Sequence, residues 1–319
     1  MDPRALDRRS ALRVLAGLAA TAALAGCAPA YSGRRLAIAA GVGAGVYYRL
    51  GGTLAAVWAE RLDAAPEVLT TAGSVDNLDR LAAGTADVAF SQVDTAAERE
   101  ADDAPDDPRS PRALARIYDD AVHVVVRRDA AAQRLADLRG AVVAVGTPIS
   151  GYYGIARRLL STAGIDPDTG IRPRQLGLAD SIAALRDGSV DAFFWSGGLP
   201  TAGITDLAAA LPIRLLDLTD LLEPVRARYP VYSPGTVPAS AYEIGEPVAT
   251  LFVRNFLLVP ASFDADLATA LLESMFAEQA RLTATSPAAL TIDPRSAIGT
   301  QPVPLHPGAE RFYREGKVS

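Results

Sequence analysis

Cysteine, lysine, histidine and aromatic residues are all scarce in this chain of 319 residues. It has one cysteine and two histidines, Lys317 is its single lysine, and aromatic residues make up 6% of it. Past residue 26 there is no run of about 18 uncharged apolar residues, which excludes a protein with several membrane spans. Since 50% of the residues are hydrophobic and 21% are charged, a wholly disordered chain is excluded as well.

The charge balance excludes another class of function. The formal net charge is −6 and no basic patch is present, so a nucleic-acid partner is not expected. The acidic cluster at residues 102–107 is predicted to be a solvated loop. The length favours roughly two domains, each able to bury its own core.

The N-terminus has the pattern of an export signal. Arg8 and Arg9 precede an apolar stretch at 14–25, and small residues lead to Cys27. This pattern predicts a signal peptide over 1–26 and a tether over 27–34, too short for a spanning helix. The sequence LAGC around Cys27 resembles a bacterial lipobox, which implies a lipid-anchored, extracytoplasmic protein; a buried cysteine is the alternative. The double arginine is also compatible with twin-arginine export.

The body alternates between strand and helix patterns. Apolar strands are predicted at 36–40, 86–90 and 141–145, and an amphipathic helix at 50–62. A second helix is predicted to open with Ser74 as its N-cap and to close at Gly84. This alternation predicts an α/β fold with parallel sheets flanked by helices.

An internal repeat with a spacing of about 105 residues divides the body. Residues 41–48 and 146–153 each join a strand to a helix with a glycine-rich, Tyr-Tyr-ending loop, and residues 81–90 are echoed by 185–194. The two copies indicate two similar α/β lobes that face one another. Because Asp87 and Asp191 occupy matching positions before a strand, a structural role is predicted for both.

Two apolar stretches are placed to cross between the lobes. They are 123–127 and 249–259, the second after a proline-rich stretch at 230–247. A long helix is expected at 264–282. The predicted division is residues 35–122 with 248–319 as lobe 1 and 123–247 as lobe 2. Two hinge crossovers would leave a ligand cleft between the lobes, outside the carboxyl ends of the strands.

Several loops that this arrangement brings to the cleft are rich in glycine, hydroxyl and amide groups. Glycines allow backbone N–H groups to approach a ligand, and helix N-termini favour a carboxylate or a phosphate. The candidate ligand-binding residues are Tyr47, Tyr48, Ser74, Asn77, Gln92, Asp94, Thr147, Ser150, Gly151 and Tyr152. The stretch 196–201 is a weaker candidate. Ser74 could instead be a simple helix cap. Tyr47 and Tyr152 could instead pack between the lobes without contacting a ligand.

Catalytic patterns are poor by comparison. His123 lies in an apolar strand and His306 in a proline-rich turn, without the spacing of a metal pair. Neither a nucleophile elbow nor a Walker loop is present, and the glycines at 41–45 do not fit the dinucleotide fingerprint. We therefore expect no enzyme, no metal and no cofactor, and a structural role for both histidines.

The order of short motifs across residues 35–316 resembles one protein family, the TAXI solute receptors of TRAP transporters. The motifs are GVYY at 45–48, GSVDNL at 73–78, GTAD at 84–87, SQVD at 91–94, LADLRG at 135–140, DAFF at 191–194, GLPT at 198–201 and PLHPGAERFY at 304–313. The resemblance implies a type II periplasmic-binding-protein fold and a monomeric receptor.

The resemblance also implies a function. The expected ligand is a small carboxylated solute, such as glutamate or 2-oxoglutarate, which is passed to a TRAP permease. The contacts that the resemblance implies are the candidate residues other than Tyr152. An ABC importer or a sensor kinase is the alternative partner. A different class of function, an enzyme with the same fold, is the other alternative. The chain departs from the family at Ile149 and Tyr152, where bulkier side chains are expected to narrow one wall of the site.

Overall fold

A computed structural model describes residues 31–316, except 44 and 105. The predicted signal peptide and residues 27–30 of the predicted tether, Cys27 among them, lie outside the described residues. Within the described part of the chain, no helix is long and apolar enough to cross a bilayer.

The strands form one mixed sheet in the order β2-β1-β3-β10-β4-β7-β5-β6, with β9 beside β10 and β8 beside β4. They are β1 (Arg35–Ala39), β2 (Ala65–Leu69), β3 (Val88–Gln92), β4 (Pro111–Arg127), β5 (Val142–Ala144), β6 (Arg172–Arg174), β7 (Ala192–Gly197), β8 (Ile213–Leu215), β9 (Tyr232–Val237) and β10 (Val248–Pro260). The groups β2-β1-β3 and β7-β5-β6 are parallel. The α/β class predicted from the alternation is confirmed.

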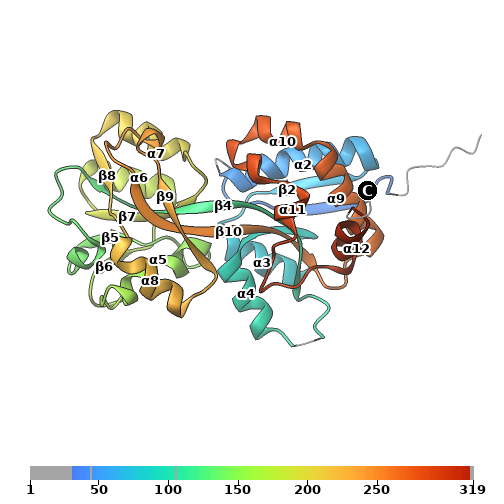
Figure 1. Cartoon of the computed structure of the whole chain (residues 1–319), viewed down its shortest axis with the longest axis horizontal. Helices are drawn as coiled ribbons and strands as arrows, with labels where there is room; N and C mark the ends of the chain where they lie inside the picture. The colour runs from blue at the N-terminus through green and yellow to red at the C-terminus, as the bar shows by residue number, and fades with distance from the viewer. Residues whose placement is uncertain (1–30, 44, 105, 317–319) are drawn as a thin grey trace, which may run out of the picture.

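Two long strands, β4 and β10, join two lobes (Figure 1). β10 pairs antiparallel with β3 in the first lobe and with β9 in the second. β4 pairs with β10 through residues 111–121 and with β7 through residues 121–126. The predicted crossovers at 123–127 and 249–259 thus belong to longer strands that complete the sheets of both lobes. The residue boundaries of the lobes stay a prediction.

Helices cover both faces of the sheet (Figure 1). In the first lobe they are α2 (Val46–Leu62), α3 (Ser74–Ala83), α4 (Val93–Asp102), α9 (Ala265–Ala277), α10 (Gln279–Thr285), α11 (Pro294–Ala297) and α12 (Pro307–Glu315). In the second lobe they are α5 (Gly151–Thr162), α6 (Leu178–Asp187), α7 (Ala202–Ala210) and α8 (Thr219–Arg228). Short 3₁₀ turns lie at Leu135–Leu138, Ala239–Ala241 and Pro287–Thr291.

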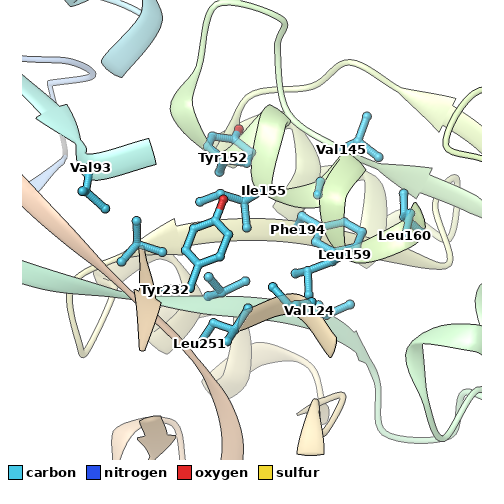
Figure 2. Packing of buried hydrophobic residues seen from close by; sticks show 14 of the residues in the cluster. Val93, Val124, Val145, Tyr152, Ile155, Leu159, Leu160, Phe194, Tyr232 and Leu251 are labelled. Atoms are coloured by element: carbon cyan, nitrogen blue, oxygen red, sulfur yellow. The ribbon is translucent and has the colours of Figure 1, made fainter. Parts of the chain in front are cut away.

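The hydrophobic core is continuous on one face of the sheet and divided on the other. One cluster runs through both lobes, from Val93 at the start of α4 to Leu159 in α5, with Tyr232 and Leu251 between them (Figure 2). On the opposite face, one cluster fills the first lobe and another the second. The lobes are therefore packed together on one side of the sheet only.

The internal repeat predicted from the sequence is a repeat of structure. Asp87 accepts a hydrogen bond from the backbone N–H of Ala37, and Asp191 accepts one from Val142, both at 2.8 Å. Each carboxylate ties the start of one strand to its parallel neighbour. The structural role predicted for both aspartates is confirmed.

Three predicted details of the elements are wrong. α2 begins at Val46 and not at 50, so both tyrosines of the first loop are helical. The N-cap of α3 is Gly73 and not Ser74. The predicted helix at 264–282 is two helices that meet at Glu278. The proline-rich stretch at 230–247, for which no element was predicted, contains β9, which tolerates proline because it lies at an edge of the sheet.

Both histidines have structural partners, as predicted. His306 is the N-cap of α12, where Nδ1 accepts the N–H of Gly308 and Nε2 lies 3.0 Å from the carbonyl of Phe263. His123 is fully buried in β4, with Nε2 2.9 Å from the hydroxyl of Tyr242. Burial lowers the pKa of His123 to about 4, so this imidazole is neutral at physiological pH.

Candidate functional site: the interlobe cavity

A cavity of about 430 Å³ lies between the two lobes. The first lobe lines it with the loop before α2, the start of α3, the end of β3 and the middle of β4. The second lobe contributes the starts of α5, α6 and α7 and the end of β7. A volume of this size suits a small molecule, and both lobes must contribute to its binding.

Six helices begin at this cavity. Their N-cap residues, all of which line it, are Gly45, Gly73, Gln92, Ser150, Gly177 and Thr201. No side chain of these residues caps the first turn of its helix. Because the first N–H groups of a helix have no partner within the helix, and the dipole is positive there, these six ends favour an anionic group.

The two hydroxyl N-caps are occupied elsewhere. Ser150 Oγ donates to the carbonyl of Thr147 at 2.7 Å. Thr201 Oγ1 donates to the carbonyl of Gly198 at 2.9 Å and accepts the indole N–H of Trp195. The sequence therefore places capping residue types at these ends without capping the helices.

Two glycines lie where the lobes approach one another. A Cβ on Gly151 would lie 2.2 Å from Gln92 Oε1 and 2.8 Å from Ser74 Oγ, which belong to the other lobe. Gly73 has φ +129, a conformation that side chains disfavour, and an added Cβ would be 3.5 Å from Ser150 Cα. These two glycines allow the starts of α3 and α5 to meet.

The floor of the cavity is polar. Gln92 Nε2 donates to Asp120 Oδ2 at 3.0 Å and to Ser196 Oγ at 2.7 Å, so this amide links the two lobes. Asp120 is 3% exposed, and burial raises its pKa to about 7. Gln92 Oε1 and Asp120 Oδ1 have no hydrogen-bond partner.

Aromatic side chains form the walls. Tyr47 stacks on Phe90 with a centroid distance of 5.1 Å and donates to Asn255 Oδ1. Tyr152 meets Trp195 edge to face at 5.0 Å, and burial raises the pKa of its hydroxyl to about 12. The walls thus combine apolar rings with hydroxyl groups that stay protonated.

The structure brings most of the predicted site residues together. Seven of the ten line the cavity: Tyr47, Ser74, Gln92, Thr147, Ser150, Gly151 and Tyr152. Ser74, expected as a cap or as a ligand contact, accepts the backbone N–H of Gln92 at 3.1 Å. It thereby fixes the end of β3 beside the cavity.

The other three do not line the cavity. Tyr48 packs against the core of the first lobe. Asn77 is fully buried and donates to the carbonyl of Phe90 at 2.7 Å, while its own oxygen accepts from Thr71. Asp94 accepts from Tyr232 at 2.7 Å and pairs with Arg158.

The expectation that Ile149 narrows the site is wrong. Its side chain is 46% exposed and does not line the cavity, while its carbonyl accepts the N–H of Asp76 across the lobes at 3.2 Å. Tyr152 does line the cavity, so only this departure from the TAXI pattern adds bulk to a wall.

Several residues of the cavity were not predicted from the sequence. Asp120, Tyr118 and Arg49 line it, as does the start of α6 at residues 177–180. For Asp120 a signal was present, because a carboxylate in a long apolar strand pattern is unusual. The weaker candidate stretch at 196–201 contributes five lining residues: Ser196, Gly197, Gly198, Pro200 and Thr201.

Several solved structures share this fold. The periplasmic aliphatic sulphonate binding protein SsuA from Escherichia coli is 17% identical, with 89% of this chain and 84% of that chain covered and a TM-score of 0.50. A putative L-cystine ABC transporter from Listeria monocytogenes is 14% identical, with coverages of 81% and 96% and a TM-score of 0.53. XAC2383 from Xanthomonas citri, solved with ATP bound, is 16% identical, with coverages of 88% and 98% and a TM-score of 0.52.

These similarities and the central cavity define the class: the fold is that of the type II periplasmic binding proteins, as the TAXI resemblance implied. Residues 38–316 match the NMT1-like family, to which the chain therefore belongs.

Proposed function

We propose that this protein is an extracytoplasmic receptor that captures a small carboxylated solute between its lobes for a membrane importer. The observation that carries the proposal is the meeting of six helix N-termini without side-chain caps at one interlobe cavity. Backbone N–H groups held in this way bind an anion without reorganisation when water is excluded. Arg49, the one cation among the described lining residues, adds positive charge at the cavity.

The proposed contacts are the seven predicted residues that line the cavity. Tyr47 and Tyr152 offer rings and hydroxyls, Thr147 and Ser150 offer hydroxyls, and the glycine at 151 exposes the start of α5. Asn77 and Asp94 support the site from behind, since Asn77 holds β3 and Asp94 is joined to α5. Closure of the lobes about β4 and β10 would enclose the solute.

For the importer we favour the ABC type, the alternative considered from the sequence. The structurally similar Listeria protein is a putative L-cystine ABC transporter, whereas the TRAP type depends on the motif order of the TAXI resemblance alone. The neighbouring genes distinguish the two: an ATPase beside a permease supports the ABC type, and a TRAP permease supports the TAXI type.

The proposal includes a lipid anchor at Cys27. It follows from the lipobox resemblance, and two or more acyl chains are needed for stable attachment. Cys27→Ser is expected to move the protein from the membrane fraction to the soluble fraction. Retention of this variant in the membrane would overturn the anchor and leave the binding function untouched.

Thermal unfolding of the purified protein against amino acids, 2-oxo acids, dicarboxylates, sulfonates and phosphates tests the receptor function. A solute that binds only the folded state is expected to stabilise it by about 2.7 kcal/mol at a hundred times its dissociation constant. Gly151→Ala should reduce the shift, because its Cβ would force the side-chain amide of Gln92 to move beside the cavity. Gly52→Ala is the matched control, since nothing lies within 4 Å of its Cβ.

A shift that is undiminished in Gly151→Ala would place the binding site elsewhere. No shift with any anion would overturn the proposal of an anionic solute.

A further inference from the structure

Asp120 is buried at the point where β4 passes from one lobe to the other. It is paired in register with Val253 of β10, and the next residue, Ala121, pairs with Gly197 of β7. Its side chain lines the interlobe cavity. Oδ2 accepts from Gln92 and lies 3.4 Å from Ser196 Oγ, whereas Oδ1 has no hydrogen-bond partner.

The neighbouring carboxylates have cations, and Asp120 has none. Asp119 is bound by the guanidinium of Arg116, with contacts of 3.1 and 2.6 Å. Asp94, as deeply buried as Asp120, is paired with Arg158. None of the groups that most affect the ionisation of Asp120 is a cation. A buried carboxylate without a counter-charge is unfavourable, and the cavity is the side from which one can arrive.

Resting on the proposed function, we infer that Asp120 binds a protonated amine of the solute and so selects an amino acid over the matching 2-oxo acid or dicarboxylate. The carboxylate of the solute lies at the helix N-termini and its ammonium group lies at Asp120. Asp180, at the start of α6, also lines the cavity. The lining therefore carries two carboxylates against Arg49, a balance that suits a zwitterion better than a dianion.

The protonation of Asp120 predicts how the affinity for the solute changes with pH. Burial raises its pKa most, hydrogen bonds from Gln92, Asn255 and Ser196 lower it, and the charge of Asp119 raises it; together they bring the pKa to about 7. Tyr47 and Tyr118 also face it, and their pKa values are raised well above 10 by burial, so they stay neutral. An ammonium group needs the ionised carboxylate, so binding displaces the proton.

Affinity for an amino acid should therefore rise by about tenfold from pH 6 to pH 8. A solute that accepts the proton of Asp120 with its own carboxylate would show the opposite trend.

Isothermal titration with matched pairs, glutamate against 2-oxoglutarate and alanine against pyruvate, tests the inference between pH 6 and pH 8. We expect one amino acid to bind at least 100-fold more tightly than its 2-oxo acid, with affinity rising with pH. Asp120→Asn should remove both the preference and the pH trend. Asp119→Asn is the matched control and should keep both, because this carboxylate pairs with Arg116 and does not line the cavity.

Each other outcome has a definite meaning. Equal binding of both members of a pair, or affinity that falls as pH rises, would overturn the role of Asp120 and leave the receptor function standing. Preferential binding of amines without a carboxylate, such as putrescine, would support Asp120 and overturn the carboxylated solute. If Asp120→Asn does not fold, the pH trend and the preference of the unaltered protein decide the question. Binding of no compound would overturn both proposals.

Discussion

Helices that begin at the cavity differ from several that begin elsewhere in how their first turns are completed. α9 starts with Asp264, which accepts the N–H of Leu267, and α11 starts with Asp293, which accepts from two N–H groups. α12 is capped by His306. The six helices at the cavity have no such bond, and neither do α8 and α10, which begin away from it. Among the described α-helices, every side-chain cap therefore lies away from the cavity.

The same difference separates two buried carboxylates. Each has one oxygen without a hydrogen-bond partner, but Asp94 is paired with an arginine, and Asp120 has no cation beside it. Polar groups that lack partners lower stability, so the binding site is expected to be a source of instability in the unliganded protein. Three predictions test this difference, in decreasing order of effect.

Arg158→Ala should have the largest effect, because it would leave the buried carboxylate of Asp94 without the arginine that pairs with it. Asp120 already lacks such a cation. The guanidinium binds Asp94, Glu98 and the hydroxyl of Tyr232, and links α5 to α4 across the lobes. Loss of one partner of a buried ion pair lowers the free energy of unfolding by roughly 3–5 kcal/mol. Urea denaturation at pH 7.5 measures the change.

The neighbouring residue provides the control for this prediction. Arg157 pairs with Asp168 at the surface, so Arg157→Ala should lower stability by no more than about 1 kcal/mol. Equal losses in the two variants would show that Asp94 does not depend on its arginine.

Asp120→Asn should raise the stability of the unliganded protein at pH 8. The pKa of Asp120 is raised from 3.8 to about 7 by burial, so the folded state favours its protonated form. The stability that this proton contributes is complete below about pH 4 and is lost as pH rises through 7. At pH 8 the variant should gain up to about 4 kcal/mol, and at pH 4 it should equal the unaltered protein.

Urea denaturation of both proteins from pH 4 to pH 8 measures the free energy of unfolding. The difference between the two proteins reports on Asp120 alone, because all other groups titrate alike in both. Asp119→Asn serves again as the control and should show no comparable gain. A gain that does not depend on pH would contradict the raised pKa as its cause.

Gly177→Asp should weaken binding of a carboxylated solute by roughly threefold to tenfold. A side chain fits at this N-cap, since nothing lies within 4 Å of its Cβ. The new carboxylate would cap α6 and place a negative charge where the solute's anion lies. Titration calorimetry with the solute found by thermal unfolding measures the change, and Gly177→Asn, a neutral cap, should weaken binding less.

Removing a cap far from the cavity is the reciprocal test. Asp264→Ala should lower stability by about 1 kcal/mol and leave affinity unchanged. If Gly177→Asp bound the solute as tightly as the unaltered protein, the start of α6 would not contact its anionic group.

Much of the fold could be predicted from periodicity and repeats, since these are local signals. The matching aspartates before β3 and β7 and the glycine ends of α3 and α6 were predictable because each acts on its near neighbours. The break between α9 and α10 at Glu278 was not, because the apolar stripe continues through it.

The site was only partly predictable, and the errors share one cause. Asn77 and Asp94 have the residue types of ligand contacts, but their partners Thr71 and Arg158 are set by tertiary structure. Asp119 and Asp120 look equivalent in sequence. Because successive side chains of a strand point to opposite faces, one meets Arg116 and the other lines the cavity.

The passage of β4 and β10 between the lobes also sets an order for folding. The second lobe takes β5 to β9 and their helices from one continuous stretch of chain. The first lobe needs β10 to pair with β3, and α12 to place the Tyr313 hydroxyl on the carbonyl of Leu114. A chain that emerges from its N-terminus can therefore assemble most of the second lobe first, and the lobe that begins the sequence is the last to be completed.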